Sequence, residues 1–260
     1  MSLPVTGLPG APARTAPVQV IDLTDEEVAV LDPRPLGERL VVLPWFDALD
    51  AAAQEVAMVT AFRGLAARGL ASGPDEDAVD RAVAGGGSSA QVPVALDPRI
   101  AEVMALRRAA SRVVVVERTV RDAADTTYLY EGGEVVLGEL VTPAGLHRFT
   151  GLAARELGAV VLDVVSTPEW AGGTGPDLVV PLGDEQPPAE VLAELAQAHV
   201  QSQVLVRRPD DDLDALTLAV VHAGPRALLV GRLALGAGEP LTLRRVTRDG
   251  LAAWLAGVLG

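Results

Sequence analysis

The sequence predicts an α+β fold: a central antiparallel sheet flanked by helical bundles, with two pseudo-symmetric helix–meander–helix halves. Two stretches, residues 113–149 and 216–246, carry this prediction because each alternates β-rich runs with short turns. Each ends in a similar tripeptide, Arg148–Thr150 or Arg245–Thr247, and an apolar segment with helical spacing follows both. We expect the two copies to pair edge to edge in one sheet, which would hide exposed strand edges.

The N-terminal segment predicts a tail, a strand and a short helix. Residues 1–16 are rich in Pro, Gly and Ala, and we expect a disordered tail. Residues 18–23 alternate loosely and predict a strand. Thr24 is expected to cap the following helix, since Glu27 three residues later completes a capping box.

A long helix follows, beginning at about Trp45 or Asp47 and ending at Arg68, just before Gly69. Its apolar residues approximate the i, i+3, i+4, i+7 spacing of an amphipathic helix. They are Leu49, Ala52, Ala53, Val56, Val59, Phe62, Ala66 and Leu70.

The next segment leads into the first meander. Residues 71–90 permit a short helix but end in a Gly/Ser run, and predict a flexible connection. Asp97–Pro98 predicts a helix start, with an N-cap carboxylate before Pro at N1. Gly132–Gly133 supplies a tight turn between two strands. Thr150 is expected to cap the closing helix, which runs to about Val161.

The second half is expected to repeat this order. Residues 163–186, with their Pro and Gly clusters, predict the crossover between halves. Pro187–Pro188 then begins a helix that continues through Val200, and the second meander follows. One domain is therefore expected over residues 17–260, with halves at about 17–165 and 166–260.

Composition excludes several function classes. The chain has 260 residues, a net charge of −14 and 3% aromatic residues, so its core is expected to be Ala, Val and Leu. The acidity argues against nucleic-acid partners and anionic membrane surfaces. The absence of cysteine excludes disulfides and thiolate metal sites. No transmembrane stretch and no signal peptide are expected, and the cytoplasm is the predicted location.

No motif predicts a catalytic, cofactor-binding or metal site. His147, His199 and His222 lack metal-ligand spacing; we expect His199 on a helix and all three exposed or half-buried. The acidic run Asp210–Asp214 lacks the glycine and terminal glutamate of an EF-hand, and Gly172–Gly175 lacks the residues that complete a phosphate loop. The favoured interpretations are a solvated turn for Asp210–Asp214 and a linker for Gly172–Gly175.

The charged and aromatic side chains of the predicted strands and helices also have structural interpretations. Strand alternation is expected to place Glu117, Glu131, Glu134 and Glu139 on the solvent face of a half-buried sheet. Trp254, between Leu251 and Leu255, is expected in the core. Trp170, in a Pro/Gly-rich connection, is instead expected to be an exposed anchor or loop plug.

This order of elements, with the Ala-Arg-Gly-Leu helix ending at Leu70 and the duplication, resembles the EspG family of cytoplasmic type VII secretion chaperones of actinobacteria. The resemblance covers about residues 17–260. It implies a non-enzymatic protein that binds a helical secretion substrate, such as a PE–PPE heterodimer. The family's substrate-contacting loop, between the second and third strands, would be Arg121–Thr126.

The predicted partner-binding site therefore combines Arg121, Asp122, Asp125 and Thr126, from the loop that the resemblance implies, with Trp170, which its Pro/Gly-rich surroundings indicate as a binding anchor. No cofactor is expected. Two other functions are left open. One is an enzyme or small-ligand protein that uses the sheet face, with His147 or His222 near Glu117 or Glu139. The other is a structural domain that homodimerises.

Overall fold

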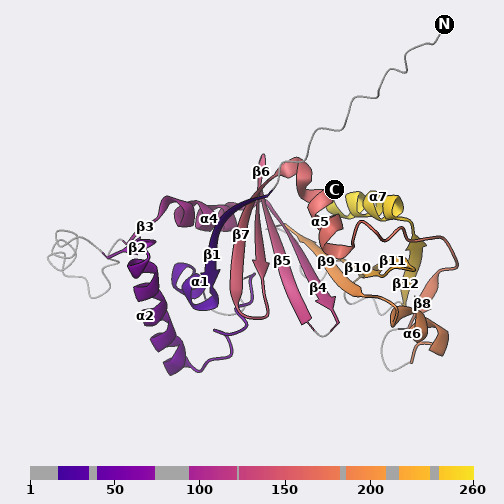
Figure 1. Cartoon of the computed structure of the whole chain (residues 1–260), viewed down its shortest axis with the longest axis horizontal. Coiled ribbons are helices and arrows are strands. Elements are labelled where there is room, and N and C mark those ends of the chain that lie inside the picture. The colour runs from indigo at the N-terminus through magenta and orange to yellow at the C-terminus, as the bar shows by residue number, and fades with distance from the viewer. Residues whose placement is uncertain are drawn as a thin grey trace, which may run out of the picture.

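The computed structural model describes residues 17–34, 40–73, 94–121, 123–181, 186–208, 217–234 and 240–260. Their main feature is one ten-stranded antiparallel sheet in the order β1-β7-β6-β5-β4-β9-β10-β11-β12-β8 (Figure 1). Its strands are β1 (Val18–Thr24), β4 (Arg112–Val120), β5 (Ala123–Gly132), β6 (Val135–Val141), β7 (Leu146–Ala153), β8 (Leu178–Val180), β9 (Val200–Arg207), β10 (Thr217–Ala223), β11 (Leu228–Ala234) and β12 (Leu241–Val246). The predicted α+β class and antiparallel sheet are confirmed.

Six α-helices and one 3₁₀ turn lie within the described residues. They are α1 (Asp25–Leu31), α2 (Ala51–Ala67), α4 (Pro98–Ala109), η1 (Ala154–Glu156), α5 (Leu157–Val165), α6 (Ala189–Leu195) and α7 (Arg248–Leu259). A separate ribbon pairs β2 (Ala71–Ser72) with β3 (Ala95–Leu96). No described helix has the length and apolarity needed to cross a membrane.

Two four-stranded meanders, β4–β7 and β9–β12, meet in the middle of the sheet. Their first strands pair antiparallel, with Val116 opposite Val204. β1 adds to the outer edge of the first meander beside β7, and β8 adds to the outer edge of the second beside β12. The sheet therefore runs without a break through both halves of the chain.

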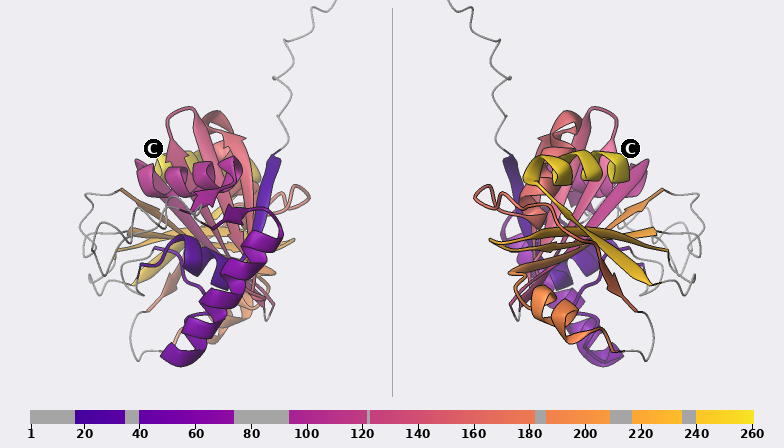
Figure 2. Two further views of the ribbon diagram at one scale, coloured as in Figure 1. Left: turned by 90° about the vertical axis from the view of Figure 1, so that its left-hand side faces the viewer. Right: turned by 90° about the vertical axis from the view of Figure 1, so that its right-hand side faces the viewer.

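Helices cover both faces of the first meander. Val115 and Tyr130 point into a core formed with α1, α2 and α4. Their neighbours Val114 and Leu129 point to the opposite face, into a core shared with α5 and α7. The side views place α2 at one end of the molecule, and α6 and α7 around the second meander (Figure 2).

Local sequence signals located most helix starts correctly. Thr24 caps α1, and Glu27 completes the predicted capping box. Asp97 caps α4 with Pro98 at N1, and Thr247 caps α7 through the backbone N–H of Gly250. Gly133, with φ +70°, occupies the turn between β5 and β6.

Three boundary predictions in the repeat are wrong. Thr150 is not a helix cap: it lies within β7, opposite Gly138 of β6, and the helix begins only at Leu157. The helix opened by Pro187–Pro188 ends at Leu195, so Val200 belongs to β9. His199 precedes β9 and is not helical. Arg148–Thr150 and Arg245–Thr247 therefore do not occupy equivalent positions.

Several predictions lie outside the described residues. They concern the 1–16 tail, the short helix within 71–90, Asp122 and the acidic run Asp210–Asp214.

Candidate functional site

Six polar side chains form a buried charge network between the first meander and helices α1 and α4. Glu139, His147 and Asp25 have no exposed surface, and Asp32, Arg107 and Tyr130 are almost completely buried. We call this set (Asp25, Asp32, Arg107, Tyr130, Glu139 and His147) the buried charge network. The prediction that Glu139 faces solvent is wrong, because helices cover both faces of this part of the sheet. The prediction that His147 is exposed or half-buried is wrong for the same reason.

His147 is the centre of the network. Its Nδ1 lies 2.7 Å from Glu139 Oε1, and its Nε2 lies 2.8 Å from Asp25 Oδ1. A carboxylate faces each ring nitrogen, so both nitrogens must carry a proton to donate a hydrogen bond. Burial lowers the pKa of His147, but its hydrogen bonds to Asp25 and Glu139 outweigh burial and raise the pKa above the ordinary value. The geometry therefore describes an imidazolium between two carboxylates.

Glu139 has three positive or hydrogen-donating neighbours. Tyr130 Oη donates to its Oε2 at 2.6 Å. Arg107 Nε lies 3.1 Å from the same oxygen but is not aligned for a hydrogen bond, so this contact is an ion pair. Burial raises the pKa of Glu139, yet Arg107 and the hydrogen bond from His147 lower it further than burial raises it. Glu139 is therefore a carboxylate in the folded protein.

The network joins distant parts of the chain. Asp25 also accepts a backbone hydrogen bond from Trp45 at 2.6 Å, and Asp32 forms two side-chain hydrogen bonds with Arg34. Its members come from α1 and the residue that caps its C-terminal end, Asp32, and from α4, β5, β6 and β7. Since the central His147–Glu139 pair has no exposed surface, the arrangement ties elements together and offers no open reaction site.

Stability is expected to fall as pH rises above about 6.5, because the folded protein binds the His147 proton more tightly than the unfolded chain does. This contribution is complete below the unfolded pKa and is lost as pH rises through the higher folded pKa. Urea unfolding between pH 6 and 9 measures it. Burial lowers the pKa of His222, which acts in the opposite direction, so the measurement belongs in the His222→Gln variant. Stability that rises over this range in that variant would contradict the assignment.

The predicted partner-binding segment Arg121–Thr126 is not a six-residue loop. Val120 pairs with Ala123, so the turn is two residues long and residues 123–126 belong to β5. Arg121 is exposed and has φ +56°, a left-handed conformation that is uncommon for a non-glycine residue. Asp125 forms a two-point ion pair with Arg118, at 2.6 and 3.1 Å.

The structure brings Trp170 to the same end of the sheet. Trp170 is half-buried against the α5–α7 core, and its ring meets His199 edge-on at 5.8 Å between centroids. His199 directly precedes Val200, which pairs with Val120 beside the turn. Trp170 is therefore not an exposed anchor, and its packing against the core is that of the other predicted role, a loop plug.

A groove of about 790 Å³ lies elsewhere, between α1 and α2. We call it the α1–α2 groove. Glu26 and Glu27 line it from α1, with Asp50 at the start of α2. Its floor on the α2 side is made mostly of small residues: Ala52, Ala53, Ala57, Ala61 and Gly64.

The helix beside this groove is largely exposed. Of the 17 residues of α2, only Leu65 is buried, although an apolar stripe at this spacing is typical of a core-facing helix. Val56 is 68% exposed and Val59 is 58% exposed. Leu49, just before α2, is also exposed, and we call Leu49, Val56 and Val59 the exposed apolar stripe. In the sequence, the only sign of this exposed surface is that the apolar residues of α2 are spread around the whole helix.

The remaining candidates form no site. His222 is mostly buried in β10, and its Nδ1 has no hydrogen-bond partner among the residues that the structure describes. Gly172 forms an isolated bridge with Thr247, so it packs beside β12 and is not a free linker. Across the described ranges, no group of three or more acidic or histidine side chains is arranged to hold a metal ion.

No family model and no curated protein matches this sequence. Its fold matches a solved structure, that of the Mycobacterium tuberculosis type VII secretion system chaperone EspG5 in complex with the PE25–PPE41 dimer. The match covers 91% of this chain and 94% of that chain, with a TM-score of 0.52 and 11% sequence identity. The chain therefore has the fold of the type VII secretion chaperone EspG5.

Proposed function

We propose that this protein is a non-enzymatic cytoplasmic chaperone or adaptor that binds a helical secreted partner of a type VII secretion system. The observation that carries the proposal is the fold shared with EspG5 over 91% of this chain. The EspG5 structure was solved with a PE25–PPE41 dimer bound, so this fold can hold a protein dimer. The exposed apolar stripe on α2 supports a protein partner, because large exposed apolar patches mark interaction surfaces.

The enzyme alternative has less support. It required His147 or His222 in an open pocket with Glu117 or Glu139. His147 and Glu139 do meet, but both are completely buried and neither lines the α1–α2 groove. Glu117 is exposed on β4, and the hydrogen bonds of His147 in the described part of the chain go to Glu139 and Asp25 instead.

We also propose that residues 17–260 form one domain of two pseudo-symmetric halves. The support is topological: each half contributes a four-stranded antiparallel meander followed by a helix, α5 or α7. The meanders join through their first strands, as an approximate twofold axis between β4 and β9 would require. Solved structures of the two halves expressed separately would test whether they fold alike.

For the partner surface we propose the end of the sheet that carries Arg121, Asp122, Asp125, Thr126 and Trp170. Arg121 is exposed there, and Trp170 lies close by through His199. Arginine and tryptophan are both enriched at the centres of protein interfaces.

Co-expression with the secreted helical proteins encoded beside this gene is expected to give a stable complex on gel filtration with light scattering. Arg121→Glu should weaken that complex by roughly tenfold or more, as expected for an interface charge that is reversed. Arg148→Glu, at an exposed position of β7, is the matched control and should leave affinity unchanged. Failure of every such protein to form a complex would overturn the proposed function.

A further inference from the structure

We infer that the α1–α2 groove is a second docking site, which receives an amphipathic helix whose apolar stripe is bordered by lysine or arginine. The inference rests on the proposed function, since the helix would belong to the secretion substrate. It concerns a different surface from the turn at Arg121, because α2 lies beyond the β1 edge of the sheet (Figure 1).

Only part of the apolar surface of α2 is covered by the residues that the structure describes. Phe62, Met58 and Leu65 already provide its contacts with the core. Leu49 and Val56 line the groove from the outside, and Val56 has two thirds of its surface exposed. Burial of this surface by a partner would be favourable, at about 25 cal/mol for each Å² of apolar area.

The shape of the groove suits a helix. Its α2 wall extends from Leu49 to Gly64, and α2 itself is about 25 Å long at 1.5 Å per residue. Small side chains at Ala53, Ala57 and Ala61 recur every four residues, so they present one continuous row to the groove. A row of small residues lets a second helix approach closely, with its larger apolar side chains against α1 and α2.

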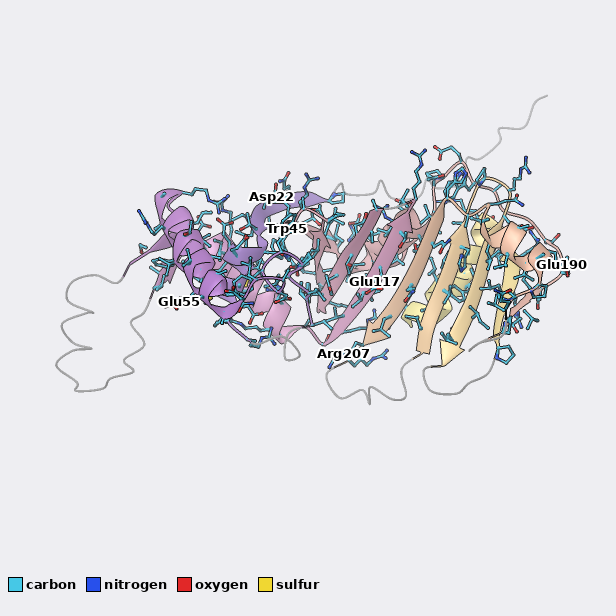
Figure 3. All side chains as sticks on the ribbon, turned by 90° about the horizontal axis from the view of Figure 1, so that it is seen from below. Asp22, Trp45, Glu55, Glu117, Glu190 and Arg207 are labelled. Atoms are coloured by element: carbon cyan, nitrogen blue, oxygen red, sulfur yellow. The ribbon has the colours of Figure 1, made fainter. Side chains whose placement is uncertain are left out.

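The acidic residues of the groove indicate which charges the partner helix carries along the border of its apolar stripe. Glu26, Glu27 and Asp50 line it, and no arginine does among the described lining residues. Glu27 is buried and paired with Arg68, so Glu26 and Asp50 are the acidic residues that leave the groove negative. Glu55, one position before Val56, adds another exposed carboxylate on α2 (Figure 3). Lysine or arginine at the edge of the partner helix would therefore face carboxylates.

The same charges disfavour a second copy of this chain as the occupant. In a twofold dimer through this face, the acidic rim of one copy would meet the acidic rim of the other. The net charge of −14 adds repulsion between the copies.

Fluorescence anisotropy with synthetic helical peptides at 150 mM salt tests the groove directly. The probe is a labelled 16-residue peptide with a leucine and alanine stripe bordered by lysine. One comparison peptide has glutamate in place of lysine, and another has the probe's composition in scrambled order. We expect only the probe to bind, and Val56→Arg to weaken binding by roughly tenfold or more. Val179→Arg is the matched control: Val179 is 51% exposed on β8 at the opposite edge, and the added charge is the same.

Each outcome has a defined meaning. Equal binding of the scrambled peptide, or equal effects of Val56→Arg and Val179→Arg, would overturn the groove assignment. A wild-type dimer that Val56→Arg converts to monomer in light scattering would overturn it too, because the occupant would be a second copy. If a secretion substrate forms a complex that Val56→Arg leaves intact, the groove assignment is wrong and the proposed function stands. Probe binding without any substrate complex would instead support the groove and overturn the proposed function.

Discussion

Replacement of Glu139 by glutamine is expected to lower the free energy of unfolding by about 3–5 kcal/mol, the usual cost of removing one partner from a buried ion pair. Glu139 is completely buried and accepts from Tyr130 and His147 while it faces Arg107. Glutamine has nearly the same shape, so it creates no cavity. It leaves the buried positive charges of Arg107 and His147 with less compensation, and that uncompensated charge causes the loss.

Glu117→Gln provides the matched control, because the same chemical change occurs at an exposed position of β4 in the same sheet. Its effect should stay within about 0.5 kcal/mol. Urea unfolding at pH 6 of both variants and the wild type measures the difference. If Glu139→Gln costs no more than Glu117→Gln, the network does not stabilise the fold in the way its geometry implies.

The features that the sequence predicted well are those set by neighbouring residues. The capping box of Thr24 and Glu27 and the Asp97–Pro98 helix start each depend on contacts within one helical turn. The turn at Gly133 likewise needs only a local positive φ. Such features form independently of how the rest of the chain folds.

The incorrect predictions concern residues whose surroundings come from distant segments. Thr150 could have capped a helix, but β7 continues through it because it pairs with β6 on one side and β1 on the other. Glu139 lies on the same face of β6 as the core residues Leu137 and Val141. Its charge is accommodated there because α1 and α4 bring Asp25 and Arg107 to that face. The incorrect helix prediction through Val200 conflicts with a local signal for β9: Val200, Ser202 and Val204 are buried and alternate with exposed glutamines.

The candidate docking surface on α2 could not be predicted from the sequence for a related reason. The sequence pattern of an apolar helix is the same whether the core covers one of its faces or that face stays exposed to a partner. For α2 the periodic residues included Phe62, which packs on the core, as well as Val56 and Val59, which do not. Only the positions of α1 and the sheet separate the two sets.

Replacement of Gly172 by alanine is expected to destabilise the protein by about 3 kcal/mol or more, from a left-handed backbone together with overpacking. Gly172 has φ +70°, and a Cβ there would lie 2.2 Å from the backbone oxygen of Val246 and 2.9 Å from the side chain of Leu228. The oxygen cannot move aside, because it accepts from the backbone N–H of Gly173. The 171–173 segment would have to leave β12, and with it the hydrogen bond from Arg248 N to Ala171 O at the start of α7.

Gly133→Ala separates the two causes of this loss. Gly133 has the same φ of +70°, but nothing lies within 4 Å of a Cβ added there. Its replacement should therefore cost only the left-handed backbone, about 1–2 kcal/mol. Thermal and urea unfolding of both variants would measure the two costs side by side. A clearly larger loss for Gly172→Ala would mean that the connection between the halves is packed against the end of the second meander and contributes to its stability, whereas equal losses would mean that backbone conformation alone explains the glycine.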